Sequence, residues 1–383
     1  MIPEVNADIK NHIEKKVSFP TQILNYLDEE KDIEDDFKKY FDDLKNQTND
    51  LKIKEILCFL KHIINNHHRS HDFFSRIEKI MIYFKDDIKN NFTEQQIFEF
   101  FIQNKRIILF LIENEFIKVD DSNIEFLKQS ENINYFLPEI ESFYLEQPIK
   151  YDGQNQERYE KFQTKRKIGE NDNIIAEMIR NDSVEQFIIY ISKTNYPLDS
   201  KIQESAYETN LLLTKKVPTL IEYAAFFGSI QIIEFLKNNK VDLTPSLWTY
   251  AIHSKNADLI HLLENNNVKP ENSDFDKCII ESIKCHHNDI ANYLLNNKGG
   301  EKGYLEYCLQ FYNFELIPND SVNYKKYERD IEQIYRCIEF NPEFVDLLFK
   351  SSYLDINMRI VFKLYFNTFF VLINPYIGAE QTC

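Results

Sequence analysis

The chain has 383 residues, of which 43% are hydrophobic and 28% are charged, a composition typical of globular and not of disordered proteins. Only 7 glycines and 11 prolines occur, which disfavours collagen-like folds and all-β folds with many turns. The formal net charge of −17 would repel DNA or RNA, so we expect no nucleic-acid partner.

The cysteines and the amino terminus indicate an intracellular protein. The segment MIPEVNADIK lacks an apolar core of signal-peptide length, and no CxxC motif occurs. We therefore expect reduced thiols and a cytoplasmic location, with the nucleus left open. The six cysteines stand at irregular positions: Cys58, Cys278, Cys285, Cys308, Cys337 and Cys383.

The first predicted domain, residues 1–147, has the pattern of several helices. Apolar residues recur at helical spacing over 51–64 and again over 73–84. Thr93 is followed three residues later by Gln96, which is the pattern of a capping box at a helix start. The short polar connections between these segments favour antiparallel helices.

Residues 148–172 differ from the segments on both sides. This stretch contains Pro148, two glycines and many polar residues. Such a composition is typical of a connection between domains, so we expect a polar linker here.

Internal repetition follows the linker. Residues 219–239 (TLIEYAAFFGSIQIIEFLKNN) match residues 246–266 (SLWTYAIHSKNADLIHLLENN) in step at an offset of 27 residues. Residues 278–297 (CIIESIKCHHNDIANYLLNN) carry the same pattern. Each segment predicts a helix, a tight turn and a second helix. One unit cannot bury the apolar side chains of its second helix, so we expect adjacent units to stack.

The first of these segments resembles the ankyrin consensus TPLHLAAxxGHLEIVKLLL, and HNDIANYLL at residues 287–295 resembles its second half. The resemblance covers residues 173–357 and is clearest over 218–297. With NNHHR at 65–69 and NKRIILFLIE at 104–113, the chain also resembles an uncharacterised ankyrin-containing family expanded in parasitic protists. The resemblance implies an all-α fold in which an N-terminal helical domain precedes a short, irregular ankyrin-type α-solenoid.

Two features depart from the ankyrin pattern. The offset of 27 residues is shorter than the usual 33 and leaves little room for a β-hairpin between units. Gly228 stands at the first turn, where a positive φ is often needed. Lys255 and His286 replace this glycine in the next two units, so we expect strained or different turns there.

The resemblance implies that a protein partner binds on the concave side, at the ends of the first helices. Carrying this over position by position singles out Phe226, Phe227, His253, Ser254 and Lys284. Aromatic side chains often dominate interfaces. Adjacent helical residues point about 100° apart, so we expect one of the two phenylalanines to be buried and the other to be available.

Sequence motifs of catalysis are absent. The chain has no glycine-rich phosphate loop, no GxSxG motif and no HExxH motif. We therefore expect that the protein is not an enzyme and binds no cofactor and no metal. Two groups of possible ligands lack metal-site spacing and are interpreted as structural: His62, His67, His68 and His71, and Cys278, Cys285, His286 and His287.

The last predicted segment, residues 358–383, contains the apolar run IVFKLYFNTFFVLI at 360–373. This run is shorter than the ~20 residues of a membrane span and contains Lys363 and Asn367, so we favour a helix that caps the last repeat.

Together these patterns predict a non-enzymatic scaffold or adaptor that binds a protein partner on the concave surface of its repeats. Two alternatives stay open. One is a host-directed or membrane-associated effector that depends on the apolar tail. The other is an enzyme with an unrecognised site in the N-terminal domain.

Overall fold

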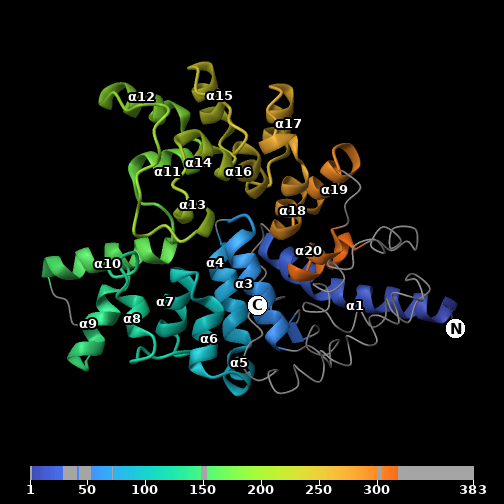
Figure 1. Ribbon diagram of the computed structural model, residues 1–383. Coiled ribbons are helices and arrows are strands. Elements are labelled where there is room, and N and C mark those ends of the chain that lie inside the picture. Colours follow the sequence, from blue (N-terminus) through green and yellow to red (C-terminus); the bar gives the residue numbers. More distant parts are fainter. Residues whose placement is uncertain are drawn as a thin grey trace. The chain divides into compact units, whose positions relative to one another are not determined.

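The structure is a computed structural model that describes residues 2–28, 41–42, 53–70, 72–147, 153–299 and 304–317. These residues form nineteen α-helices and two short 3-10 helices, and no strand occurs among them (Figure 1). The predicted all-α class is therefore confirmed. The predicted tail at 358–383, and the repeat residues after 317, lie outside the described part of the chain.

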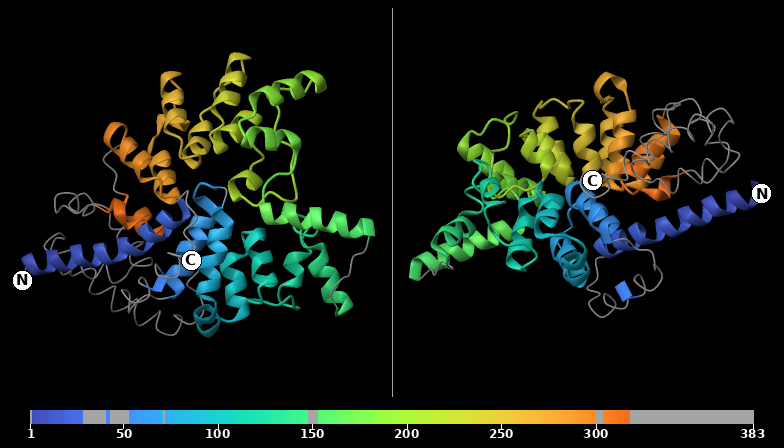
Figure 2. Two further views of the ribbon diagram at one scale, coloured as in Figure 1. Left: turned by 180° about the vertical axis from the view of Figure 1, so that it is seen from behind. Right: turned by 60° about the horizontal axis from the view of Figure 1, so that its bottom comes forward.

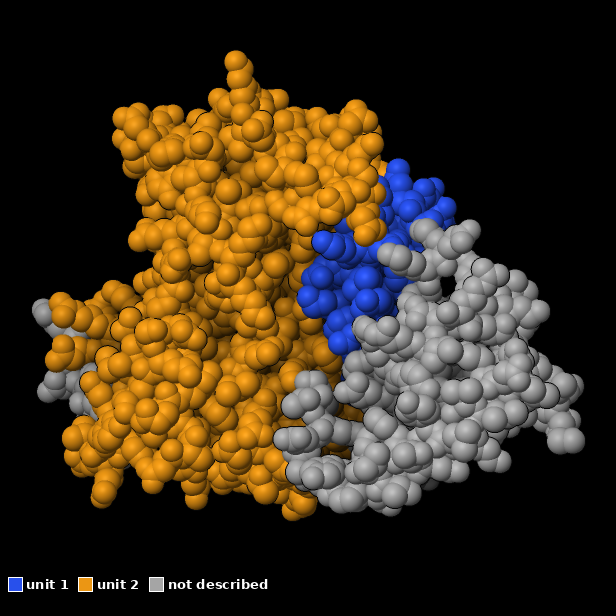
Figure 3. All heavy atoms as spheres, in the orientation of Figure 1, with its two compact units in different colours: residues 1–51, 275–383 blue, residues 52–274 orange. Residues whose placement is uncertain are grey.

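The chain divides into two compact units (Figure 3). The central unit comprises residues 52–274, and the terminal unit combines residues 1–51 with residues 275–383. The predicted boundaries at 147 and 172 both fall inside the central unit, and the division of the chain into those domains stays a prediction.

The central unit begins with seven helices: α3 (Ile53–Asn66), α4 (Phe73–Tyr83), α5 (Lys85–Asn91), α6 (Glu94–Phe101), α7 (Lys105–Glu113), α8 (Ile124–Leu127) and α9 (Leu137–Leu145). The predicted capping box starts α6. The Gln96 amide donates to Thr93 Oγ1 at 3.2 Å, and the Thr93 amide donates to Gln96 Oε1 at 2.9 Å. Residues 106–111 of α7 are all buried, which marks α7 as a helix surrounded by protein.

The predicted polar linker contains the helix α10 (Gly153–Ile168). Arg166, in its last turn, is fully buried and donates to the carbonyl of Tyr135 at 2.9 Å. Its guanidinium also binds both carboxylate oxygens of Glu139, at 2.6 and 3.0 Å. A segment with the composition of a linker is therefore tied to the preceding helices by a buried ion pair.

Helix pairs make up the rest of the central unit. They are α11 (Ile174–Arg180) with α12 (Val184–Thr194), α14 (Leu220–Phe227) with α15 (Ile230–Asn238), and α16 (Leu247–His253) with α17 (Ala257–Asn265). A short helix, α13 (Leu211–Lys215), precedes α14, and a 3-10 turn, η1 (Glu271–Ser273), follows α17. The first helices α11, α14 and α16 lie side by side, and the second helices form another layer (Figures 1 and 2). The predicted helix–turn–helix segments at 219–239 and 246–266 are thus confirmed.

Neighbouring pairs contact one another through apolar side chains. Ala224 and Ala251 are fully buried where α14 and α16 meet. Phe235 of α15 is half-buried, and its ring contacts Phe187 of α12 with centroids 6.0 Å apart. Trp248 is buried and donates its Nε1–H to the Val268 carbonyl at 2.9 Å. Neighbouring pairs therefore bury apolar side chains that a single pair would leave exposed.

The connections between pairs differ in length. The short connection from α15 to α16 contains no β-hairpin, as its length predicts. The longer connection from α12 to α14 contains one isolated antiparallel bridge, between Lys201 and Thr219.

The turn inside each pair has the same backbone conformation. Asp182, Gly228 and Lys255 follow the first helices and have φ values of 46°, 69° and 55°. The next residue links its pair to the preceding one. Ser229 Oγ donates to the Ile179 carbonyl at 2.5 Å, and Asn256 Nδ2 donates to the Gly228 carbonyl at 3.3 Å.

We expect glycine at position 255 to stabilise the central unit. A left-handed conformation costs a residue with a Cβ about 1–2 kcal/mol, so Lys255→Gly should raise the free energy of unfolding by about 0.5–1 kcal/mol after the entropy of the unfolded chain is included. Gly228→Ala should lower it by about 1–2 kcal/mol, because the added Cβ would lie 3.2 Å from Asn256 Nδ2. Urea unfolding followed by the fluorescence of Trp248 measures the stability of both variants. Destabilisation by Lys255→Gly would contradict the left-handed conformation of residue 255.

The terminal unit contains α1 (Ile2–Asp28), α18 (Asp276–Cys285), α19 (Asn288–Asn297), α20 (Leu305–Gln310) and the 3-10 turn η2 (Phe314–Leu316). The turn conformation recurs here. His286 and Tyr312 have φ values of 58° and 59°, and Asn313 Nδ2 donates to the Ile283 carbonyl at 2.9 Å. The predicted helix–turn–helix at 278–297 is confirmed, and its turn is left-handed without a glycine.

The expectation that the cysteines are reduced thiols holds for only some of the described cysteines. Cys278, Cys285 and Cys308 are free and buried, and burial raises the pKa of the Cys308 thiol to about 12. Cys58 is disulfide-bonded, so the expectation is wrong at that position. Among the described residues, no helix combines the length and apolar character that crossing a bilayer requires.

Candidate functional site

The predicted partner-binding residues differ in exposure. Phe226 and His253 are buried, at 4% and 2% exposure, and their rings stack with centroids 5.5 Å apart. Phe227 and Ser254 are half-buried. One of the two adjacent phenylalanines is therefore buried and the other partly available. Lys284, in α18 of the terminal unit, is half-buried and donates to Glu281 at 2.9 Å.

Two predicted residues of equal register, Phe226 and His253, lie in contact in the central unit. Phe226 and His253 each stand two residues before the left-handed turn residue of their pair, and Arg180 holds the same position in α11. Arg180 donates to Tyr223 Oη of the next first helix at 3.0 Å. The central unit thus brings four of the five predicted residues to the ends of two neighbouring helices, α14 and α16.

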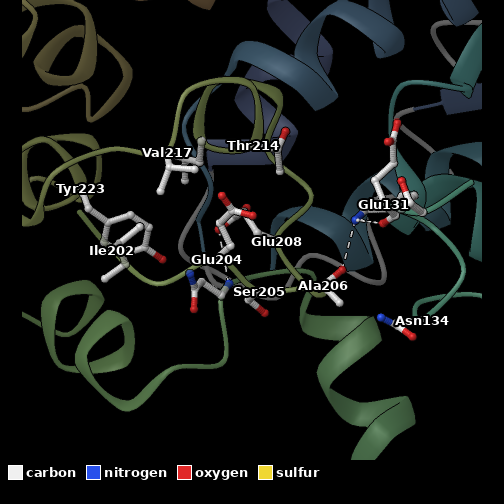
Figure 4. A pocket seen from close by; sticks show the side chains of 14 residues that line it. Glu131, Asn134, Ile202, Glu204, Ser205, Ala206, Glu208, Thr214, Val217 and Tyr223 are labelled. Atoms are coloured by element: carbon white, nitrogen blue, oxygen red, sulfur yellow. Dashed lines mark hydrogen bonds between the residues drawn. The ribbon is translucent and has the colours of Figure 1, made fainter.

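A pocket of about 290 Å³ opens in the central unit near the first turn of α14 (Figure 4). One side comes from the turns between α8 and α9, and the other comes from the long connection between α12 and α14. The lining residues are Lys105, Ser130, Glu131, Asn134, Asn171, Ile202, Glu204, Ser205, Ala206, Glu208, Leu213, Thr214, Val217 and Tyr223.

Glu208 organises the base of this pocket. Its carboxylate accepts the backbone amides of Thr209 and Asn210 at 2.9 and 2.8 Å and that of Asn171 at 3.3 Å. Burial raises the pKa of Glu208, while the Arg69 guanidinium, 3.8 Å away, acts in the opposite direction. Since both oxygens are occupied by the chain itself, Glu208 fixes the loop that carries the pocket.

Lys105 joins the two sides. Its Nζ donates to the Ala206 carbonyl at 3.1 Å and to the Glu131 carbonyl at 3.3 Å. Burial lowers the pKa of Lys105, and the nearby carboxylates of Glu208 and Glu131 act against this. The ammonium group therefore holds the loop at residue 206 and the turn at residue 131 together by hydrogen bonds.

The rest of the pocket combines an apolar wall with an acidic rim. Ile202, Leu213 and Tyr223 are buried, whereas Glu131 and Glu204 are exposed. In Figure 4, Glu204 and Glu208 lie between the apolar residues Ile202 and Val217 and the opposite wall at Glu131. The described residues that line the pocket include no histidine and no cysteine. Its chemistry suits binding of a group that has both an apolar and a cationic part.

Sequence patterns did not reveal this pocket. Its residues are spread from 105 to 223, and among them only Lys105 and Tyr223 belong to a repeat or motif that the sequence patterns single out. The segment ESAYE at 204–208 supplies several of the lining residues, but its sequence has only the pattern of an ordinary polar loop.

Comparisons of this chain with family models, curated proteins and solved structures found no match.

Proposed function

We propose that the chain is a non-enzymatic scaffold or adaptor, in which ankyrin-type helix pairs from residue 173 onward present the ends of their first helices to a protein partner. One observation carries the proposal. The same left-handed turn recurs after each first helix, and Ser229 and Asn256 each donate a hydrogen bond to a carbonyl at the end of the preceding first helix, those of Ile179 and Gly228. Equal positions of successive units then form a row, which is the geometry that repeat proteins use for extended binding surfaces.

Within this row, Phe227 and Ser254 make the partner contacts and the buried residues support them. Phe227 is half-buried, and its ring lies 5.0 Å from that of Phe226 and 4.9 Å from that of Tyr223. A ring held by neighbouring rings loses little conformational entropy on binding, which favours it as an interface anchor. Lys284 of the terminal unit stands two residues before the left-handed residue His286, which is the position that Phe226 and His253 hold in their helices.

The test compares Phe227→Ala with Phe235→Ala. Both side chains are half-buried phenylalanines of one helix pair, but Phe235 lies on the second helix. Quantitative affinity purification from the native cell should show about a tenfold loss of one partner with Phe227→Ala and no loss with Phe235→Ala.

Thermal unfolding of both variants supplies the control. Each loses aromatic contacts, so both melting temperatures should fall by a similar amount. Equal loss of the partner in the two variants would mean that destabilisation, and not a binding surface on α14, explains the result. Unchanged capture in both would reject the proposal.

A further inference from the structure

We infer that the pocket between the turn at 130–134 and the connection at 202–217 binds an arginine side chain of the protein partner. This inference rests on the proposed function and names the chemistry of the partner. It is carried by three features of the pocket: its size, its apolar wall and the charges at its rim.

The size and the wall fit a long side chain that is apolar along its stem. The cavity of about 290 Å³ can hold one large side chain but not a folded segment. Ile202, Leu213 and Val217 form an aliphatic wall, and the Tyr223 ring is fully buried beside them. The three methylene groups of arginine can lie along such a surface while the charged end stays near water.

The rim supplies acceptors for the charged end. The carboxylates of Glu131 and Glu204 are exposed and accept no hydrogen bond from a described residue. Glu208, by contrast, is used by the backbone amides of its own loop. A planar guanidinium with five N–H donors can reach carboxylates on two sides of a pocket, which an ammonium does less well.

The charge balance excludes an anion. Three carboxylates and one ammonium line the pocket, and the Lys105 ammonium is already bound by two carbonyl oxygens. The whole chain carries a formal charge of −17. A cationic group is therefore attracted at long range and at the rim, and an acidic group is repelled at both.

The experiment uses the full chain with labelled Ile, Leu and Val methyl groups, observed by NMR. The probe is N-acetyl-arginine-N-methylamide, and the control is the citrulline analogue, which has nearly the same shape but no charge. We expect the methyl signals of Ile202, Leu213 and Val217 to shift with the arginine probe at millimolar concentration. The citrulline probe should leave them unchanged, and the corresponding lysine probe should bind more weakly.

Rim variants make the test specific. Glu131→Gln and Glu204→Gln remove charge from exposed positions, and each should weaken arginine binding about threefold, with about a tenfold loss for the pair. Glu157→Gln, an exposed carboxylate on α10 outside the pocket, should have no effect. The inference is overturned if the three methyl signals do not move, if citrulline or lysine binds as well as arginine, or if the rim variants bind normally.

The arginine-binding test and the partner-capture test can fail independently of each other. Failure of the arginine probe together with partner loss in Phe227→Ala would reject only the pocket. Arginine binding together with normal partner capture by Phe227→Ala would reject the binding surface on α14 and leave the pocket in place.

Discussion

Replacing Arg166 with methionine should lower the free energy of unfolding of the central unit by about 3–5 kcal/mol. Methionine retains much of the apolar stem, so the change removes mainly the charge and its hydrogen bonds. It leaves the Glu139 carboxylate, which is only 12% exposed on its side chain, without its bidentate partner. It also leaves the Tyr135 carbonyl without the guanidinium donor. Loss of one member of a buried pair costs more than the pair contributes, because the remaining charge stays desolvated.

The measurement is urea unfolding of the full chain followed by Trp248, the only tryptophan, which lies in the central unit. Lys161→Met is the matched control. Lys161 belongs to the same helix and pairs with Glu157 at 2.6 Å, but both side chains are exposed. The control should change stability little, because water screens exposed pairs. Equal effects of the two substitutions would show that the end of α10 is not tied to the preceding helices.

The second large effect is a loss of stability at alkaline pH. Burial raises the pKa of Tyr135, Tyr223 and Tyr250 above the ordinary value of 10.0. In the folded state these tyrosines keep their protons at a pH where the unfolded chain has lost them. The unfolded state then binds fewer protons, so the free energy of unfolding falls as pH rises above about 10. The slope is about 1.4 kcal/mol per pH unit for each tyrosine, or about 4 kcal/mol for all three.

Urea unfolding at pH 8, 9, 10 and 11, again read from Trp248, measures this slope. Tyr250→Phe provides the control. The Tyr250 hydroxyl is buried and has no hydrogen-bond partner among the described residues, so its removal should leave stability at pH 8 unchanged or higher. The same variant should reduce the alkaline slope by about a third. A wild-type stability that is constant between pH 9 and 11 would show that these hydroxyls are accessible to water.

Local sequence signals predicted the helices and their pairing well. The capping box at Thr93, the small residues Ala224 and Ala251, and the turn at Gly228 each depend on residues a few positions apart. Helical periodicity and capping chemistry act over the same range, so they can be read from one sequence. The turn at Lys255 was harder to predict, because its left-handed backbone is imposed by the stacked pairs on a residue that does not favour it.

Long-range contacts explain what the sequence did not reveal. The polar composition of 148–172 predicts a linker, yet Arg166 is buried because Glu139, 27 positions earlier, lies beside it. Likewise the two sides of the pocket are joined by Lys105, which binds the carbonyl of Ala206, 101 positions later. His253 is buried, because the ring of Phe226 on the neighbouring helix stacks against it. Each of these features depends on which segments meet in three dimensions.

The central claim is that a protein partner contacts the exposed part of the α14 end, at Phe227. Photo-crosslinking tests this most directly, with benzoyl-phenylalanine at position 227 in one protein and at position 235 in another. We expect position 227 to crosslink in cells to the partner that Phe227→Ala fails to capture, and position 235 to give no such product. Crosslinks of equal yield from both positions, or none from position 227 while the partner is still captured, would contradict it.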